Sequence, residues 1–325
     1  MPCFFRECEP TAELRRFATA FAGVYAYHFV VDKLIISPFT DWLVRSKRLK
    51  KDRRDKCRES LYKNAAVGAF FALGLSIGWG HDWFFNPKGY FVEFPWDAPE
   101  ELRWYYMIYL SFWFQSVDFM LNLTNNHYKV KRKDNAEMLV HHFATIALMV
   151  FSYYFDLTRV GICVLMLHDV NDLLLETAKF FVYLEEETIA NIFFGLFALV
   201  WFVVRWFVYA HNILRSVYYE AYESIIVRIQ AEGVFYGIDA TVWYYVWCGF
   251  FAFLSLLLVL HIYWGVLIVK MVSKALNSGN VEKDIRSDSE SEEDEEEVVK
   301  QPKAQAESAE PVDGKPKRRR APKAE

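Results

Sequence analysis

Apolar stretches of roughly 18–25 residues, separated by short polar segments, dominate the chain as far as about residue 270. A helix of about 20 apolar residues is long enough to cross the ~30 Å hydrocarbon core of a bilayer. The pattern therefore predicts an all-α polytopic membrane protein with about seven transmembrane helices. The predicted spans are Phe17–Ile36, Asn64–Gly80, Trp104–Leu123, Met138–Tyr154, Arg159–Thr177, Ile192–His211 and Val242–Val269.

Composition agrees with this pattern, because 54% of the 325 residues are hydrophobic and 18% are aromatic. The first predicted span carries His28, Asp32 and Lys33, so it fits a lipid-exposed helix least well. The acidic and basic residues near the N-terminus, including Arg6 and Glu7, are not those of a cleavable signal peptide.

The distribution of charge predicts the orientation in the membrane. The segment Arg45–Arg58 holds nine Lys and Arg against two Asp, which places it in the cytosol. Lys129–Lys133 has four bases and falls on the same side, whereas His81–Arg103 has five acids and two bases and falls on the luminal side. With seven spans, the N-terminus is then luminal and the C-terminus cytosolic.

The chain divides into three parts. One boundary follows the basic loop after the first span, and the other lies near residue 276, where aromatic residues disappear from the sequence. Residues 1–56 form the luminal N-terminus, first span and basic cytosolic loop, residues 57–275 the main membrane domain, and residues 276–325 a disordered cytosolic tail. Ser287–Glu297 combines eight acids with three serines. This segment is either simply solvated or a kinase target, with Ser287, Ser289 and Ser291 as the candidate phosphorylation sites.

Polar residues cluster in the fourth and fifth predicted spans. His141 and His142 are adjacent in one, and the other carries His168-Asp169-Val170-Asn171-Asp172. The short turn Phe155–Thr158 makes the two spans an antiparallel hairpin, so residues whose numbers sum to about 312 lie at one depth. The sequence therefore predicts that three histidines and two aspartates converge inside the membrane.

An Asp at the centre of a membrane span costs roughly 2.5–3.5 kcal/mol, so two of them require compensation or a function. Polar contacts that merely hold helices together are one interpretation. A second is a histidine nucleophile or general base oriented by carboxylates, and a third is a metal-dependent lipid oxygenase. The chain lacks the repeated His-x-x-His-His boxes of membrane desaturases and hydroxylases, which argues against the metal.

A longer signature surrounds these residues. Arg132-Lys133-Asp134-Asn135-Ala136-Glu137-Met138-Leu139-Val140-His141-His142 is followed by Leu167-His168-Asp169-Val170-Asn171-Asp172 and by Leu175-Glu176-Thr177-Ala178-Lys179. Over about Cys57–Met271 the sequence closely resembles the Lag-type signature of ceramide synthases, within the TLC-domain family. Asn135 replaces a usual aromatic residue, and Asp156 stands where Asn is common. The homeobox-like insert of some animal members has no room between the first two spans.

The resemblance implies a ceramide synthase of the endoplasmic reticulum membrane, which transfers an acyl group from acyl-CoA to a sphingoid base. His141, His142, His168, Asp169 and Asp172 are the expected catalytic residues. Acyl-CoA is a co-substrate, so neither a cofactor nor a metal is expected. The expected partners are acyl-CoA, the sphingoid base, membrane lipids and a second subunit in a homo- or heterodimer, with no nucleic acid.

Four further residues are candidates for substrate binding. Arg132 and Lys133 lie in a basic cluster that either attracts the phosphates of CoA or only sets the topology. Arg205 either binds a CoA phosphate or pairs with a buried carboxylate, and His261 either contacts substrate or is a hydrogen-bonded packing residue. An alternative function is a non-enzymatic TLC-type protein that senses lipid or assists translocation.

Overall fold

The structure is a computed structural model that describes residues 10–124, 128, 135–235 and 238–278. In the N-terminal half the elements are α1 (Pro10–Val31), the π-helical turn η1 (Asp32–Ile36), α2 (Ser37–Arg45), the 3₁₀ turn η2 (Lys51–Arg53), α3 (Arg54–Gly78), the 3₁₀ turn η3 (Pro87–Gly89) and α4 (Glu100–Leu121). They are followed by α5 (Asn135–Tyr154), α6 (Thr158–Tyr183), α7 (Glu187–Val200), η4 (Trp201–Leu214), α8 (Arg215–Ala221), η5 (Tyr222–Ile226), α9 (Val227–Glu232), β1 (Val234–Phe235), β2 (Ile238–Asp239) and α10 (Ala240–Ser278).

In the described residues these elements form seven long helical segments, because α1, η1 and α2 run on as one helix and α7 to α9 as another. The predicted all-α polytopic membrane fold is confirmed. Five of the seven are long and apolar enough to cross a membrane, namely Thr11–Arg45, Lys51–Gly78, Asn135–Tyr154, Glu187–Glu232 and Ala240–Lys274.

The two remaining segments, α4 and α6, are 22 and 26 residues long, enough for about 33 and 39 Å of helix. They carry the polar residues that lower their hydropathy, including Asp118 on α4 and Asp169 and Asp172 on α6. Much of each helix is buried against its neighbours, and α6 packs against α3, α5, α7 and η4. Charged groups in a membrane are tolerated when they face the interior of the bundle.

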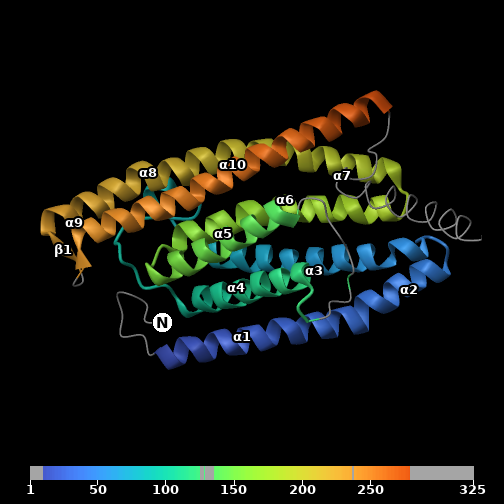
Figure 1. Cartoon of the computed structure of the whole chain (residues 1–325), viewed down its shortest axis with the longest axis horizontal. Coiled ribbons are helices and arrows are strands. Elements are labelled where there is room, and N and C mark those ends of the chain that lie inside the picture. Colours follow the sequence, from blue (N-terminus) through green and yellow to red (C-terminus); the bar gives the residue numbers. More distant parts are fainter. Residues whose placement is uncertain (1–9, 125–127, 129–134, 236–237, 279–325) are drawn as a thin grey trace, which may run out of the picture.

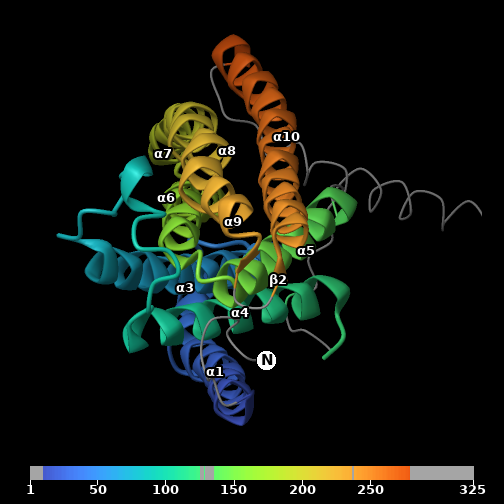
Figure 2. The ribbon, with the colours of Figure 1, turned by 90° about the vertical axis from the view of Figure 1, so that its left-hand side faces the viewer.

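The helices lie in layers. Figures 1 and 2 show α1 at one side of the molecule, α3 to α6 in the middle, and α7 to α9 with α10 at the opposite side. The centre of the molecule is therefore lined by α3, α4, α5 and α6, and it is covered from one side by η4 and α10. The candidate catalytic residues all lie on these elements.

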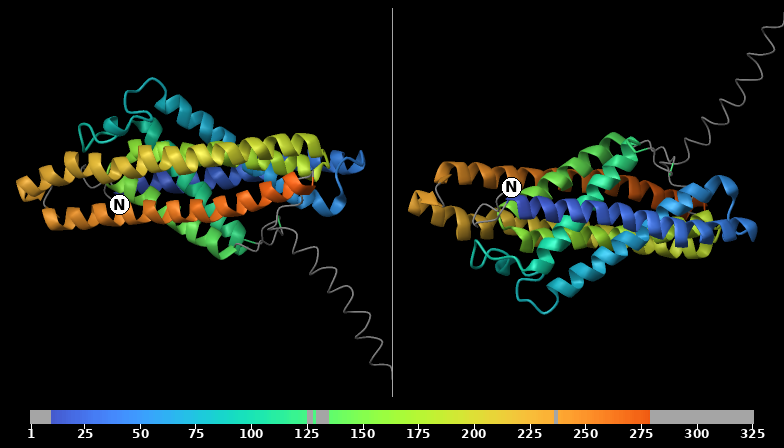
Figure 3. Two further views of the ribbon diagram at one scale, coloured as in Figure 1. Left: turned by 90° about the horizontal axis from the view of Figure 1, so that it is seen from above. Right: turned by 90° about the horizontal axis from the view of Figure 1, so that it is seen from below.

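Two helices are longer than the sequence pattern predicts. The predicted sixth span ends at His211, but the helix continues from Glu187 to Glu232, and α10 runs beside it (Figure 3). A helix of 46 residues is about 69 Å long, roughly twice the hydrocarbon thickness. These helices therefore project beyond the bundle at one end, where the two short strands β1 and β2 pair antiparallel between them.

The predicted hairpin of the fourth and fifth spans is confirmed, since only three residues separate the end of α5 at Tyr154 from the start of α6 at Thr158. The start of α6 also packs closely against α4. The hydroxyl of Tyr106 donates to the carbonyl of Thr158 at 3.2 Å, and Gly161 leaves the room that this ring occupies. A Cβ at position 161 would lie 1.8 Å from the Tyr106 hydroxyl.

Candidate functional site

His141 and His142 of α5 lie next to the same aromatic residue of α4. The ring of Trp113 meets His141 edge-on at 5.7 Å and His142 at 5.1 Å. The Nδ1 atom of His142 donates to the carbonyl of Met138 at 2.6 Å, so its tautomer is set by its own helix. The Nδ1 atom of His141 is buried without a hydrogen-bond partner in the described part of the chain. His141 is thus positioned by rings rather than by a polar partner.

Two further rings complete the packing around His141. His168 of α6 stacks against it, with ring centroids 6.0 Å apart and planes 19° apart. Trp264 of α10 meets it edge-on at 5.4 Å. Residues from three helices therefore orient one imidazole, which also borders the central cavity.

His168 is part of a buried polar network. Its Nδ1 atom donates to the carbonyl of Val164 at 2.7 Å, and its Nε2 atom faces Nε2 of His261 at 3.0 Å. That short contact between two ring nitrogens requires one of them to carry a proton. Arg205 of η4 lies 3.1 Å from the same His261 nitrogen and donates to the carbonyl of His168 at 3.1 Å. The network ties α6, η4 and α10 together behind His141.

Arg205 also binds the acidic side of α6. Its guanidinium lies 3.4 Å from a carboxylate oxygen of Asp172 and 3.4 Å from the amide oxygen of Asn171, and it stacks over Trp201. Only 3% of Arg205 is exposed, whereas 42% of the Asp172 side chain is accessible. This supports the pairing interpretation of Arg205 and leaves the carboxylate of Asp172 open to the cavity.

Asp169 is directed away from the other acid. It is fully buried, and the hydroxyl of Tyr109 on α4 donates to its Oδ1 atom. Tyr109 in turn stacks on Phe70 of α3 with ring centroids 4.0 Å apart. Asp169 therefore joins α6 to α4, and it does not line the central cavity.

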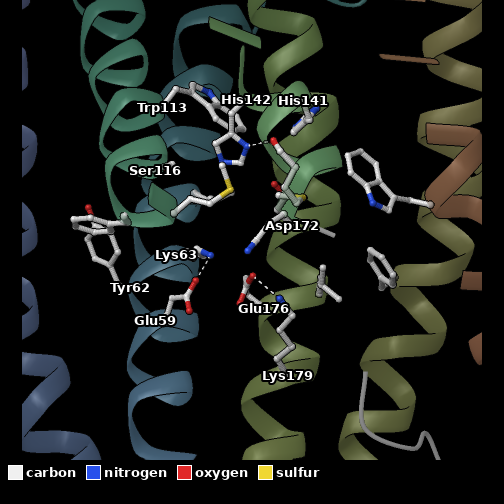
Figure 4. Close-up of a pocket in the computed structure, with 18 of the residues that line it drawn as sticks. Glu59, Tyr62, Lys63, Trp113, Ser116, His141, His142, Asp172, Glu176 and Lys179 are labelled. Atoms are coloured by element: carbon white, nitrogen blue, oxygen red, sulfur yellow. Dashed lines mark hydrogen bonds and ion pairs between the residues drawn. The ribbon is translucent and has the colours of Figure 1, made fainter. Parts of the chain in front are cut away.

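The central cavity has a volume of about 220 Å³ and lies between α3, α4, α5, α6, η4 and α10. Figure 4 shows His141 and His142 at one end of the cavity. Toward the other end are two ion pairs, Lys63 with Glu59 on α3 and Lys179 with Glu176 on α6. The Glu176–Lys179 pair spans one turn of α6. The cavity thus has two imidazoles at one end and, at the other, a charged mouth formed by these two ion pairs.

A second, smaller cavity of about 30 Å³ begins at His168 and Trp113 and lies farther along the bundle. Apart from these two, its lining is largely apolar and includes Leu148 and Met149 of α5 and Leu254 and Leu257 of α10. Trp113 borders both cavities. The histidines therefore stand between the central cavity, which carries the charged groups, and a smaller space with apolar walls.

The structure brings together most of the residues predicted from the sequence. His141, His142, Asp172 and Arg205 line the central cavity, while His168 stands just behind them. His261 is fully buried and contacts Arg205 and His168, so it lies in the network and not on the cavity wall. Arg132 and Lys133 lie outside the described residues, as do Ser287, Ser289 and Ser291.

Sequence reasoning missed the aromatic and charged residues that α3 and α4 contribute. The sequence does not mark Trp113, Tyr109, Tyr62 and Lys63 as site residues. Only the packing of α3 against α6 and of α4 against α3 and α5 brings them to the site. Trp264 lies three residues after His261 and therefore on the same face of the helix, so the sequence alone could have indicated it.

No group of three or more His, Cys, Asp or Glu has a geometry suited to holding a metal ion in the described ranges. The imidazoles of His168 and His261 bind each other instead of converging on a common point.

A bundle of seven long helices with histidines and an aspartate around a buried cavity defines a polytopic membrane protein with an intramembrane polar site. A family model described as the TLC domain (TRAM, LAG1 and CLN8) matches residues 56–270. The chain belongs to this family.

Curated relatives are similar over most of the chain. Ceramide synthase LOH2 of Arabidopsis thaliana is 32% identical over 299 residues, which cover 88% of this chain and 96% of the relative. ASC1-like protein 3 of Oryza sativa subsp. japonica is 33% identical, over 83% of this chain and 93% of the relative. Ceramide synthase 4 of Homo sapiens is 32% identical, over 79% of this chain and 62% of the relative.

Proposed function

We propose that this protein is a ceramide synthase, which transfers the acyl group of an acyl-CoA to the primary amine of a sphingoid base. The products are an amide and free CoA. Relatives of nearly the same length carry the name ceramide synthase, which supports this assignment. The observation that carries it is the position of His141, whose imidazole borders a cavity with a charged mouth at one end and apolar walls beyond.

The two cavities suit the two parts of an acyl-CoA. Lys63 and Lys179 at the charged mouth are available to the phosphates of the CoA headgroup, although each also pairs with a glutamate. The apolar side chains beyond His168 and Trp113 mark the direction of the hydrocarbon tail, and because the cavity there is only about 30 Å³, a long acyl chain requires the surrounding helices to separate. An acyl-CoA that extends through both would hold its thioester carbonyl beside His141.

The first chemical step is the attack of a His141 ring nitrogen on the thioester carbon. The carbon–sulfur bond breaks, CoA leaves as a thiolate that takes up a proton, and the acyl group remains on the imidazole. The amine then attacks the acyl carbon, the bond to the imidazole breaks, and the amine proton passes to His142 or His168. This regenerates His141. Without the covalent step, His141 would act as the base toward the amine.

Asp172 and Arg205 support this chemistry from the cavity wall. The accessible carboxylate of Asp172 would hold the ammonium group of the sphingoid base, while its pairing with Arg205 at 3.4 Å keeps the carboxylate in place. Arg205 would also fix the backbone of α6 through the carbonyl of His168. These two residues therefore act as a binding residue and a positioning residue.

The direct test is turnover by the purified protein with a sphingoid base and acyl-CoAs of several lengths, with the amide detected by mass spectrometry. We expect amide and CoA in equal amounts. A well-folded protein that forms no amide with any acyl-CoA would point to a lipid-binding role instead. Incubation with radiolabelled acyl-CoA alone separates the two mechanisms, because only the covalent one leaves label on the protein.

We also propose that the protein lies in the endoplasmic reticulum membrane with a luminal N-terminus and a cytosolic C-terminus. The basic loop between α2 and α3 contacts the turn between α6 and α7, since Lys50 and Arg53 lie 2.5 and 3.2 Å from Glu185. This contact supports the topology, which requires both loops on one side. Protease added to sealed microsomes should remove a C-terminal tag and spare an N-terminal one.

The acidic tail and the oligomeric state add two smaller proposals. Phosphorylation of Ser287, Ser289 or Ser291 would be detected by mass spectrometry of the native protein, and an unmodified tail would count against it. A homo- or heterodimer would be detected by light scattering of the purified protein in detergent.

A further inference from the structure

A third cavity lies between α1, α3 and α4. Its volume is about 370 Å³, within the range of about 300–1,000 Å³ found for ligand sites. Its walls are almost entirely apolar, with Leu73 and Phe70 on α3 and Trp104 and Ile108 on α4. We call it the α1 chamber. The helix that closes it, α1, precedes the segment of the chain that matches the TLC domain.

Two features of the sequence hold the α1 chamber open. Asp32 in η1 forms a buried ion pair with Arg58 of α3 at 2.6 Å, which joins the two helical segments at one end. On another side α1 packs along α4, where Phe17 contacts Phe114 and His28 contacts Phe119. The facing positions carry small side chains, namely Ala20 and Gly23 on α1 and Ala66 and Ala69 on α3. A Cβ at Gly23 would have no atom within 4 Å, so it would extend into free space.

The α1 chamber adjoins the catalytic cavity. Tyr62 and Phe112 line both spaces, with ring centroids 6.4 Å apart, and so form a partition one side chain thick. The hydroxyl of Tyr62 donates to the side-chain oxygen of Gln115, which holds the ring in the partition. Glu59 lies one turn before Tyr62 on α3 and lines the catalytic cavity. An apolar space thus meets a cavity that carries carboxylates.

We propose that the α1 chamber holds the hydrocarbon tail of the sphingoid base, while its amine passes the partition into the catalytic cavity. A sphingoid base is an amphiphile with an apolar tail and a cationic head, and the α1 chamber and the acids beyond the partition match these two parts. The apolar cavity beyond His168 is then left to the acyl chain. This inference rests on the proposed function, and it assigns the two lipid substrates to separate sites.

Gly23→Leu tests the assignment, because Gly23 lines the α1 chamber and an added Cβ there meets no atom within 4 Å, so the new side chain occupies space that a lipid tail would need. Gly195→Leu on α7 is the matched control, since Gly195 is also exposed with no atom within 4 Å of an added Cβ. We expect Gly23→Leu to raise the KM for a long-chain sphingoid base at least about tenfold, because even one methylene contact can be worth that much. The KM for acyl-CoA should not change. Equal kinetics for the two variants would overturn the proposal.

Photolabelling decides the same question without turnover. A sphingoid base with a diazirine in mid-chain should label peptides of α1 and α3 in the wild type and in Gly195→Leu, and much less in Gly23→Leu. Labelling only elsewhere, or labelling of these peptides by a diazirine acyl-CoA instead, would overturn the proposal. Labelling of α1 and α3 by the base in a protein that forms no amide would refute the proposed function and leave the lipid site standing.

Discussion

Some buried polar residues of this protein attach one helix to another, and others are placed to react. Asp169 is the clearest case, since the sequence places it beside His168 while the structure turns it toward Tyr109 of α4. His141 is the contrasting case, because rings surround it and its Nδ1 atom has no partner among the described residues. We infer that His141 reacts and that Asp169 holds the scaffold.

The attachment of α4 to α6 through Asp169 leads to a stability prediction. Tyr109→Phe removes the hydroxyl that donates to the buried carboxyl, and we expect the free energy of unfolding to fall by about 1–3 kcal/mol. Tyr245→Phe, at an exposed position of α10, is the control and should have little effect. Thermal unfolding in detergent measures both. A Tyr109→Phe protein as stable as the control would contradict the structural role of Asp169.

The turn between α5 and α6 gives a prediction about pH. Burial raises the pKa of Asp156 from 3.8 to about 7, so folding favours the protonated carboxyl. The stabilisation is therefore complete below about pH 4 and is lost as the pH rises toward 7, by up to about 4 kcal/mol. Asp156→Asn keeps the shape and should abolish this loss. Unfolding of both proteins between pH 4 and pH 8 tests it, and parallel curves would show that Asp156 does not titrate in this range.

At the scale of helices, the sequence predicted which segments cross the membrane but not how far they extend. The apolar pattern ends near His211 because polar residues such as Arg215 and Glu220 follow it, yet the helix continues to Glu232. Packing against α10 stabilises the helix beyond the apolar stretch. Tyr209 and Trp247 form hydrogen bonds between the two helices. Helix ends beyond the hydrocarbon core are set by such contacts.

Close packing of α4 against α6 is a property of these helices that one substitution tests. Gly161→Ala would place a methyl group against the Tyr106 hydroxyl and should cost about 1–3 kcal/mol of stability. Gly195→Ala has free space around it and should be neutral or slightly stabilising, because alanine favours helix. Thermal unfolding compares the two. Adding Tyr106→Phe should recover part of the loss, and a harmless Gly161→Ala would show that α4 and α6 are not packed as described.

For the whole molecule, the fold and the centre of the site were readable from the sequence, while the cavity walls were not. The short turn between α5 and α6 makes them an antiparallel hairpin, which brings His141 near His168 and Asp172. Their distances from this turn along the chain were therefore enough to predict that they lie at one depth. Tyr62 and Trp113 come from helices distant in sequence, so only the packing of the bundle places them.

The arrangement of helices also explains why the site is divided. Inner helices α3 to α6 carry the polar residues, η4 and α10 supply Arg205 and His261, and α1 adds a separate apolar space. An acyl transfer between two lipids requires such a division, because both hydrocarbon chains must be accommodated while their reactive ends meet. His141 lines the central cavity and stacks on His168, which lines the smaller apolar cavity.

The most direct test of this account is the rate of amide formation by His141→Ala. His211→Ala is the matched control, since His211 is an exposed histidine of η4 outside the cavities described. We expect His141→Ala to lose at least about 100-fold in rate while remaining folded, as befits loss of a nucleophile or general base, and His211→Ala to retain wild-type activity. Undiminished turnover by folded His141→Ala would contradict the central claim that the reaction takes place at this imidazole.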